Sequence, residues 1–266
     1  MEGYELHLRN LGRSDNTIAA YSFAARQLMD RIQTLTNEAL LDHKDWLIAT
    51  YAAKTANNRT IAINTYLDYI GYEGIRLSGV KIQQKPFLDN VVSPTEYETL
   101  RGHLEQNQDW FWLYIIRFLA CTGARVSELR RFTVEDVIAG HMDIISKGSK
   151  LRRIYIPKAL QKDALAWCKD IGKKTGALFL GERGTVITAR GIAQGLKRIA
   201  NRCGVNESVV YPHSFRHLFA KNFIKRNPDI ALLADLMGHE SIETTRVYLR
   251  RTAQEQREEV NATVDW

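Results

Sequence analysis

Three histidines, an arginine and a tyrosine stand out in the last fifth of the chain, in sequence that is otherwise mostly apolar and helical. His213, Arg216 and His217 come first, His239 follows, and Tyr248 stands nine residues after His239. Imidazole, guanidinium and phenol groups can each bind a phosphate or move a proton beside one. These residue types therefore indicate chemistry on a phosphate group, and the rest of the chain must position them.

The composition is that of a globular protein with an anionic partner. The chain has 266 residues, 45% of them hydrophobic, which is enough to bury an ordinary core. No apolar run reaches the roughly 18–20 residues that span a bilayer, and the N-terminus lacks the apolar core of a signal peptide. We therefore expect a soluble, cytoplasmic protein with no membrane partner. Residues 1–90 hold ten basic and ten acidic residues, so the net charge of +7 lies entirely in the later residues, which we expect to face a polyanion.

The first segment, to about residue 77, has the periodicity of helices. A short apolar stripe stops at Gly12, and later periodic runs cover Glu38–Tyr51 and Ala56–Tyr72. Four or so short helices of this kind form a compact bundle. We therefore predict a helical domain at residues 1–78 and a linker at 79–93, where the periodicity lapses.

The second domain, predicted at residues 94–266, mixes helices with a small antiparallel sheet. Residues 142–156 alternate enough to form two strands joined at a basic tip. The other predicted elements are helices at Pro94–Gln106, Asp109–Cys121, Lys158–Lys169 and Ala189–Cys203, and a short strand pair near Leu178–Ile187. The expected fold class is therefore mainly α with a small antiparallel β-sheet.

Four motifs together resemble the tyrosine recombinases, the group of phage integrases and Xer recombinases. In chain order they are Gly123–Leu129 (GARVSEL), Ser146–Lys150 (SKGSK), Pro212–His217 (PHSFRH) and Leu236–His239 (LMGH), the last completed by Thr244–Tyr248 (TTRVY). One such motif is unremarkable by chance, but four in the order of the family are not. The resemblance covers nearly the whole chain and implies a helical core-binding domain followed by a mixed α/β catalytic domain.

The resemblance also implies a reaction and the residues that perform it. The implied catalytic positions are Arg125, Lys147, His213, Arg216, His239 and Tyr248, with Glu128 and His217 in supporting roles. The implied reaction cuts and rejoins duplex DNA through a 3′-phosphotyrosine link at Tyr248. Because this link conserves the energy of the broken bond, no ATP is required.

The chemistry explains why these residue types are needed. Arg125 and Arg216 can clamp the non-bridging phosphate oxygens, on which negative charge develops. His213 or His239 can accept the proton of the tyrosine, whose ordinary pKa is about 10, or can orient the phosphate. Lys147 is the candidate general acid for the leaving 5′-oxygen. With two arginines and a lysine in place the reaction demands no metal, and we expect no cofactor.

Several of these residues also have simpler interpretations. Tyr248 could be a core aromatic of an amphipathic helix, although the Gly-His pair upstream favours a nucleophile. His213 and His217 could form a zinc pair, but no intervening glutamate or third acidic ligand accompanies them. Lys150 is a rival general acid in the same tip. Glu128, expected to orient the first arginine or a histidine, could be only a surface residue.

Basic and polar side chains elsewhere are candidates for contacts to DNA. Phosphate contacts fix position and supply salt-dependent affinity but little sequence information. The basic candidates are Lys150, Arg152, Arg153, Lys197, Arg198, Arg202, Lys221, Lys225 and Arg226. Weak candidates for base contacts in the helical domain are Asn57, Asn58, Arg59 and Thr60.

The expected activity is site-specific recombination by a homotetramer on two double-stranded DNA sites, for integration, excision or resolution. As in the family, a tail helix at Ala253–Val264 is expected to pack on a neighbouring protomer. Accessory DNA-bending or directionality factors are further expected partners. Two alternatives stay open: a type IB topoisomerase, which relaxes DNA without exchanging partners, and a catalytically silent DNA-binding regulator on the same fold.

Overall fold

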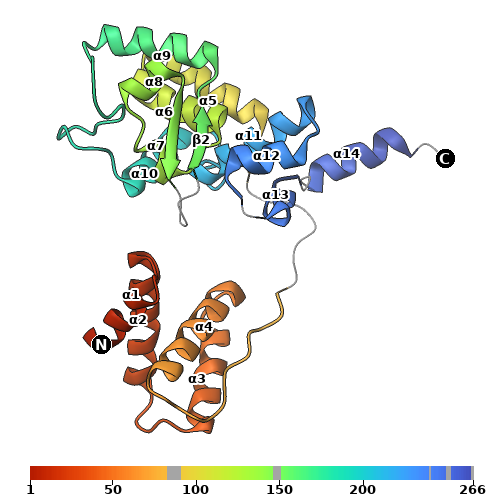
Figure 1. The fold of residues 1–266 in the computed structure, drawn as a ribbon. Helices are drawn as coiled ribbons and strands as arrows, with labels where there is room; N and C mark the ends of the chain where they lie inside the picture. Colours follow the sequence, from red (N-terminus) through yellow and green to blue (C-terminus); the bar gives the residue numbers. More distant parts are fainter. Residues whose placement is uncertain (83–90, 146–150, 240, 250–252, 265–266) are drawn as a thin grey trace. The chain divides into compact units, whose positions relative to one another are not determined.

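The structure, a computed structural model, describes residues 1–82, 91–145, 151–239, 241–249 and 253–264 (Figure 1). Lys147 and Lys150, the two candidate general acids, therefore lie outside the described residues. The chain divides into two units, Met1–Lys85 and Pro86–Trp266, and each has its own hydrophobic core. None of the helices in the described part of the chain combines the length and apolar character that a bilayer crossing needs.

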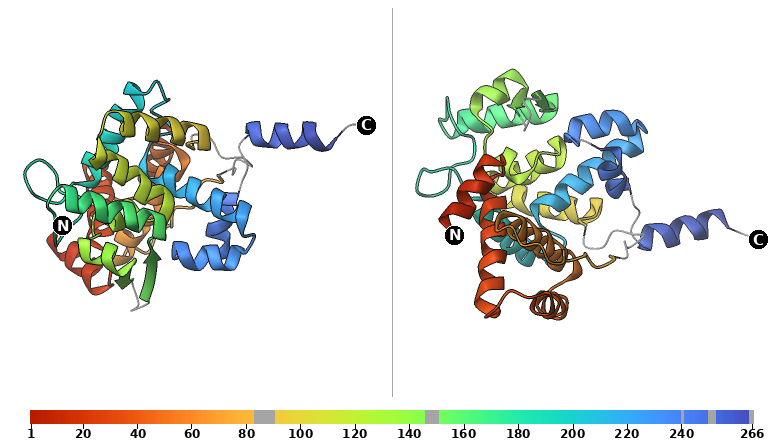
Figure 2. Two further views of the ribbon diagram at one scale, coloured as in Figure 1. Left: turned by 90° about the horizontal axis from the view of Figure 1, so that it is seen from above. Right: turned by 60° about the horizontal axis from the view of Figure 1, so that its bottom comes forward.

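The first unit is a bundle of four helices. They are α1 (Glu2–Asn10), α2 (Asp15–Arg31), α3 (Asn37–Thr50) and α4 (Ala53–Tyr69). The hydroxyls of Ser14 and Thr36 each accept a hydrogen bond from a backbone amide in the first turn, which begins α2 and α3. Helix α4 packs against the other three, and the red-to-orange helices lie side by side in the views of Figures 1 and 2.

The segment after α4 is held onto that helix by two asparagine side chains. The amide of Asn64 bonds both backbone groups of Leu77 at 2.9 Å, and the amide of Asn57 bonds those of Val80 at 2.7 and 2.9 Å. The first unit therefore continues past the predicted boundary. Asn57 is occupied by these bonds and Thr60 is only 4% exposed, so their places do not fit the weak prediction that they contact bases.

His43 of α3 is a histidine enclosed in the first core. It is fully buried beside Trp46, and neither ring nitrogen has a hydrogen-bond partner among the described residues. Burial, reinforced by the charges of Arg31 and Arg59, lowers the pKa of His43 to about 4. The folded protein therefore keeps this imidazole neutral in mildly acidic solution, where the unfolded chain binds a proton.

We expect this histidine to destabilise the fold as the pH falls from 6.5 to 4. Above pH 6.5 the ring is neutral in both states and contributes nothing, whereas by pH 4 the difference reaches about 3 kcal/mol. Urea unfolding of the wild type and of His43→Leu at several pH values measures it, and the variant should lose less stability over this range. Equal losses in both proteins would contradict the prediction.

The second unit contains ten helices and one hairpin among its described residues. The helices are α5 (Pro94–Gln106), α6 (Trp110–Thr122), α7 (Val126–Leu129), α8 (Val134–Ala139), α9 (Lys158–Asp170), α10 (Ala189–Arg202), α11 (Pro212–Arg226), α12 (Ile230–Met237), α13 (Ile242–Leu249) and α14 (Ala253–Thr263). Strands β1 (His141–Ile145) and β2 (Leu151–Tyr155) pair antiparallel, with Met142 opposite Ile154. The predicted fold class, mainly α with a small antiparallel sheet, is confirmed.

The second predicted strand pair is reduced to one isolated bridge, between Leu180 and Val186. A tight turn follows the bridge, in which the amide of Gly181 bonds the carbonyl of Thr185 and the amide of Gly184 bonds the carbonyl of Gly181. The ladder goes no further because the amide of Leu178 bonds the carbonyl of Phe132 and Thr188 already caps α10.

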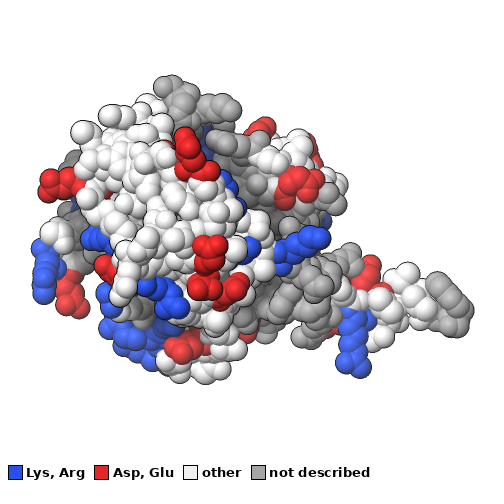
Figure 3. Space-filling view, turned by 90° about the horizontal axis from the view of Figure 1, so that it is seen from below, with Lys and Arg blue, Asp and Glu red and all other residues white. Residues whose placement is uncertain are grey.

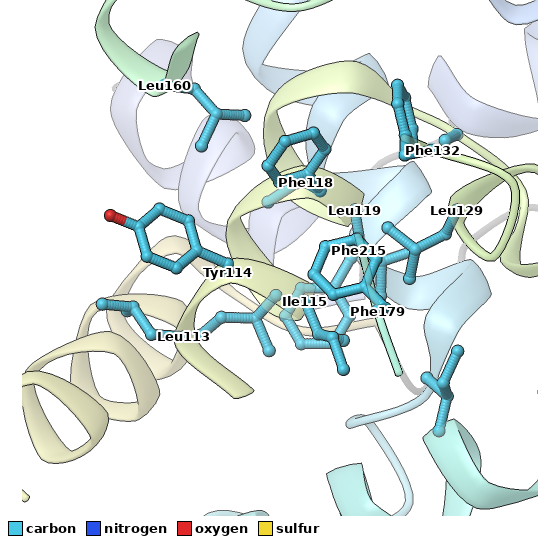
Figure 4. Close-up of a cluster of buried hydrophobic side chains, with 14 of the residues drawn as sticks. Leu113, Tyr114, Ile115, Phe118, Leu119, Leu129, Phe132, Leu160, Phe179 and Phe215 are labelled. Atoms are coloured by element: carbon cyan, nitrogen blue, oxygen red, sulfur yellow. The ribbon is translucent and has the colours of Figure 1, made fainter. Parts of the chain in front are cut away.

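Helix α6 forms the centre of the second core and packs against α5, α9 and α11. Phe118 of α6 meets Phe132 and Phe179 edge-on, with ring centroids 5.1 and 5.5 Å apart (Figure 4). Such aromatic pairs add about 0.5–1.5 kcal/mol each beyond the area that they bury. The C-terminal end of α6 is thereby fixed, and with it the motif that begins at Gly123.

Candidate active site

Gly123 ends α6 in a turn that brings two predicted arginines together. Its φ is +64°, and a Cβ at this position would lie 2.5 Å from the Phe219 ring, so only glycine fits without a shift. The Gly123 carbonyl accepts a hydrogen bond of 2.6 Å from Nη1 of Arg216 on α11. Two residues later Arg125 is the N-cap of α7. One turn therefore links the two guanidinium-bearing segments.

Three successive carbonyl groups at the end of α12, those of residues 236–238, each accept a hydrogen bond from a different arginine. Arg152 Nη2 donates to the first at 2.8 Å, Arg216 Nη2 to the second at 2.6 Å, and Arg125 Nη2 to the third at 3.1 Å. Arginine alone supplies enough donors in one plane to hold a carbonyl and still reach another partner. The end of α12 thus joins β2, α7 and α11 at one place.

Glu128 orients Arg125, as one of the two interpretations of the sequence predicted. Its Oε2 accepts from the Arg125 backbone amide at 2.7 Å, and its Oε1 accepts from Nη1 of Arg125 at 2.9 Å and of Arg152 at 2.6 Å. Burial opposes ionisation, but the amide of Arg125 and the charge of Arg152 together lower the pKa of Glu128. With 8% of its surface exposed, Glu128 is no surface residue.

Arg152 is buried and does not lie on the surface, where a contact to a DNA phosphate was predicted. It is 9% exposed, on the same inner face of β2 as Ile154. Arg153, the next residue, points outward and makes two bonds of 2.7 and 2.8 Å to Asp143. Burial lowers the pKa of Arg152 to about 10, so it stays charged at neutral pH beside Glu128. The prediction of a phosphate contact is corrected for Arg152, because the alternation of the strand turns this side chain inward.

Arg216 is held by neutral groups in the interior of the site. It is 1% exposed, and besides the two carbonyls its Nη2 lies 2.8 Å from Nε2 of His239. A carbonyl or a neutral imidazole positions a guanidinium without cancelling its charge. Arg125, by contrast, exposes 41% of its side chain. The two predicted arginines therefore belong to one hydrogen-bond network, in which Arg216 is buried and Arg125 is accessible to solvent.

The three histidines of the site all have lowered pKa values. Burial is the main cause, with neighbouring cations adding to it, and the pKa of His239 falls to about 4 and that of His217 to about 3. His213 is exposed by its accessible surface, and its pKa is also lowered, by partial desolvation and then by the charges of Arg216 and Arg125. His213 and His217 meet edge-on, 5.0 Å apart. A neutral imidazole can accept a proton, as the chemistry predicted for this site requires.

Tyr248 is placed by its helix. The backbone of α13 is described over the whole helix, and α13 packs against α11, which carries Arg216, and against α12, whose last carbonyls hold the three arginines. The tyrosine side chain lies outside what the structure describes, as does Lys147. The structure thus brings Arg125, Arg216 and His239 together and carries the backbone of Tyr248 on a helix packed against α11 and α12.

The sequence profile of the phage integrase family matches residues 90–255. This is more than half of the chain and includes every residue of the site. The chain belongs to the phage integrase family. Within this family it is 30% identical over 265 residues to tyrosine recombinase XerC of Herpetosiphon aurantiacus, covering 89% of this chain and 85% of the relative.

Two further comparisons extend over nearly the whole integrase-family chain. Tyrosine recombinase XerA of Pyrococcus furiosus is 28% identical over 269 residues, covering 98% of this chain and 92% of the relative. The crystal structure of a lambda integrase dimer bound to a core site has a TM-score of 0.74 at 18% identity, with 93% of each chain covered. This last likeness concerns the fold.

The basic candidates of α10 lie on the surface of this integrase-family chain. Lys197, Arg198 and Arg202 are exposed, opposite the buried face of Ile192 and Leu196. Lys225 and Arg226, at the end of α11, are also exposed, whereas Lys221 is partly buried. On the face drawn in Figure 3, described basic side chains stand in separate groups among acidic ones.

In the first unit, Arg59 lies over aromatic rings. Its guanidinium is 3.9 Å from the centroid of Tyr51 and 5.0 Å from that of Phe23, and it donates to Oε1 of Gln27. Asn58 beside it is exposed. Cation–π stacking orients an arginine without neutralising its charge. Arg59 therefore remains a candidate for DNA contacts, and so does Asn58, because it is exposed.

Thr245 was not among the site residues predicted from the sequence. This threonine of α13 is fully buried, and its Oγ1 lies 2.8 Å from Nδ1 of His239. Its position three residues before Tyr248 was the available signal, because residues i and i+3 share a face of a helix. A polar side chain on the face of the nucleophile would therefore have been a candidate partner for the site.

Proposed function

We propose that this chain is a site-specific DNA recombinase that cleaves and rejoins duplex DNA through a covalent 3′-phosphotyrosine link at Tyr248. The observation that carries the proposal is the arrangement of Arg125, Arg216 and His239. The two arginines donate to neighbouring carbonyls at the end of α12, and Arg216 is also within hydrogen-bond distance of His239. Relatives named tyrosine recombinases and the lambda integrase complex with DNA support it.

The two guanidiniums stabilise the charge that develops when the phosphodiester is attacked. The attacked phosphorus gains a fifth oxygen, and its non-bridging oxygens become more negative than in the ground state. Arg216 is pre-positioned by two carbonyls, and Arg125 by Glu128 and a third carbonyl. Because these partners are set before DNA binds, little reorganisation opposes the reaction. One lost donor of this kind usually costs about 10²–10³ in rate.

Proton transfers complete each half of the reaction. The Tyr248 hydroxyl loses its proton as its oxygen bonds to phosphorus, and the neutral His213 or His239 is the acceptor. The bond from phosphorus to the 5′-oxygen breaks, and we assign the proton for that oxygen to Lys147. Rejoining reverses these steps, since the 5′-hydroxyl attacks the phosphotyrosine and the tyrosine leaves.

The substrate is double-stranded DNA at a recombination site. For the exchange of strands we propose a homotetramer on two sites, in which α14 packs on a neighbouring protomer. Val260 of this helix and Val264, directly after it, are 57% and 43% exposed in the single chain, and such apolar side chains would be covered in an assembly. DNA-bending or directionality factors are proposed as further partners.

The test is a strand-exchange assay. Candidate recombination sites are taken from the DNA that flanks the gene. Wild-type protein should recombine two plasmids that carry the site and leave a covalent protein–DNA complex on a denaturing gel. Tyr248→Phe should bind the DNA equally well but form neither product. Relaxation of a plasmid without any site, with no exchange, would favour a topoisomerase. Binding with no covalent complex would favour a silent regulator.

A further inference from the structure

His239 lies between two helices of the site and touches a polar group of each. Its Nε2 is 2.8 Å from Nη2 of Arg216 on α11, and its Nδ1 is 2.8 Å from Oγ1 of Thr245 on α13. Thr245 is fully buried. Tyr248 stands three residues later on the same helix. The imidazole therefore connects the helix of the nucleophile to an arginine of the phosphate site.

The partner of Nε2 determines which ring nitrogen carries the proton. A guanidinium has only donors, so Nε2 must offer a lone pair to Arg216. The single proton of a neutral imidazole then sits on Nδ1, where the threonine oxygen is the acceptor. The lowered pKa of His239, which burial and the charges of Arg216 and Arg125 cause, keeps the ring neutral at neutral pH. Both nitrogens are thus satisfied in one tautomer only.

We propose that Thr245 is a positioning residue of the cleavage reaction, whose hydroxyl accepts the Nδ1 proton of His239 and keeps Nε2 as an acceptor directed at the phosphate site. This inference rests on the proposed function. When a phosphate binds Arg216, Nε2 is left with its lone pair facing the reacting groups. It can then take the proton of the Tyr248 hydroxyl, as the tyrosine oxygen bonds to phosphorus and the 5′-oxygen leaves with a proton from the general acid.

The imidazolium formed in this step keeps its bond to the threonine. Its Nδ1–H still donates to Oγ1 of Thr245, and its new Nε2–H can donate to a non-bridging phosphate oxygen. A hydrogen bond to a charged donor is roughly twice as strong as one between neutral groups. Thr245 therefore stabilises the charged form, which exists only during the reaction, more than the resting form.

The test compares Thr245→Val with Thr245→Ser and Thr244→Val. Valine keeps the shape but removes the acceptor, serine restores it, and Thr244 is an exposed neighbour on the same helix. We expect Thr245→Val to lower the single-turnover rate of cleavage at saturating protein about tenfold or more, the usual effect of one lost hydrogen bond to a charged group. Half-saturating protein concentration should not change, and the other two variants should cleave as the wild type does.

A measurement without DNA separates this inference from the proposed function. In protein labelled with ¹⁵N-histidine, the couplings of the ring nitrogens report the tautomer, and the loss of one signal in His239→Gln assigns it. We expect the Nδ1–H form in the wild type and in Thr245→Ser, and a shift toward the Nε2–H form in Thr245→Val. A wild-type ring in the Nε2–H form, or equal cleavage by the two valine variants, would overturn the inference. Absence of cleavage by the wild type, with the expected tautomer, would overturn the proposed function and with it the role in cleavage, and would leave standing only the hydrogen bond that fixes the tautomer.

Discussion

Replacing Arg216 by alanine is expected to lower the rate of DNA cleavage at saturating protein by about a thousandfold or more. The side chain is enclosed and bonds the carbonyls of Gly123 and Met237 as well as His239. Its removal takes away a positive charge where the phosphate becomes more negative, and it also releases the histidine. Single-turnover cleavage of a nicked substrate, with a denaturing gel to separate the covalent product, measures the effect.

Two controls distinguish lost charge from lost structure. Arg216→Lys keeps the charge but cannot bond two carbonyls and a phosphate in one plane, so we expect about a hundredfold loss. A neutral methylphosphonate at the scissile position should reduce the difference between wild type and Arg216→Ala, because less charge then needs to be stabilised. A variant that unfolds at the wild-type temperature and cleaves at the wild-type rate would refute the role of Arg216.

Arg152→Met is expected to slow cleavage by about a hundredfold, which is the usual cost of misplacing a reacting group by roughly 1 Å. Arg152 donates to Glu128 and to the Leu236 carbonyl. Without it the end of α12 loses its tie to β2, and that end also holds Arg125 and Arg216. The buried acceptors left behind should lower the free energy of unfolding by about 1–3 kcal/mol. Rates at saturating protein and urea unfolding measure both effects.

Arg153→Ala is the matched control, since the two arginines are neighbours on β2. Arg153 is exposed and paired only at the surface with Asp143. If it contacts a phosphate, its loss should weaken DNA binding and reduce the slope of log K against log salt by about one unit, with cleavage at saturation unchanged. The same salt effect in Arg152→Met, with normal cleavage, would show that Arg152 also meets the DNA backbone.

The positions of the helices along the chain could be predicted because they depend on side-chain periodicity. The predicted bounds of α5 and the position of the hairpin agree with the structure, since apolar spacing, a capping serine and alternation act locally. Glu128 was also predictable, because a residue three positions after Arg125 shares its helical turn. The strand pair near 178–187 was overestimated because the residues that flank its single bridge pair with another segment or begin α10.

The hydrogen-bond acceptors that hold the arginines could not be predicted, because they are main-chain carbonyls, which every residue type has. Nothing in the motif at residues 236–239 reveals that three successive carbonyls bind three arginines. The inward direction of Arg152 was readable in principle, since it is two residues before the apolar Ile154 on the same strand. The prediction that Lys150, Arg152 and Arg153 all contact DNA did not take that alternation into account.

The most direct test of the account is to identify the residue that becomes linked to DNA. Wild-type protein is trapped on its site with denaturant, the DNA and protein are digested, and the peptide that retains a nucleotide is sequenced by mass spectrometry. We predict a 3′-phosphoryl nucleotide on Tyr248, within the tryptic peptide 247–250, and no linked peptide from Tyr248→Phe. A linkage to another residue, or cleaved DNA with no linked peptide, would contradict the account.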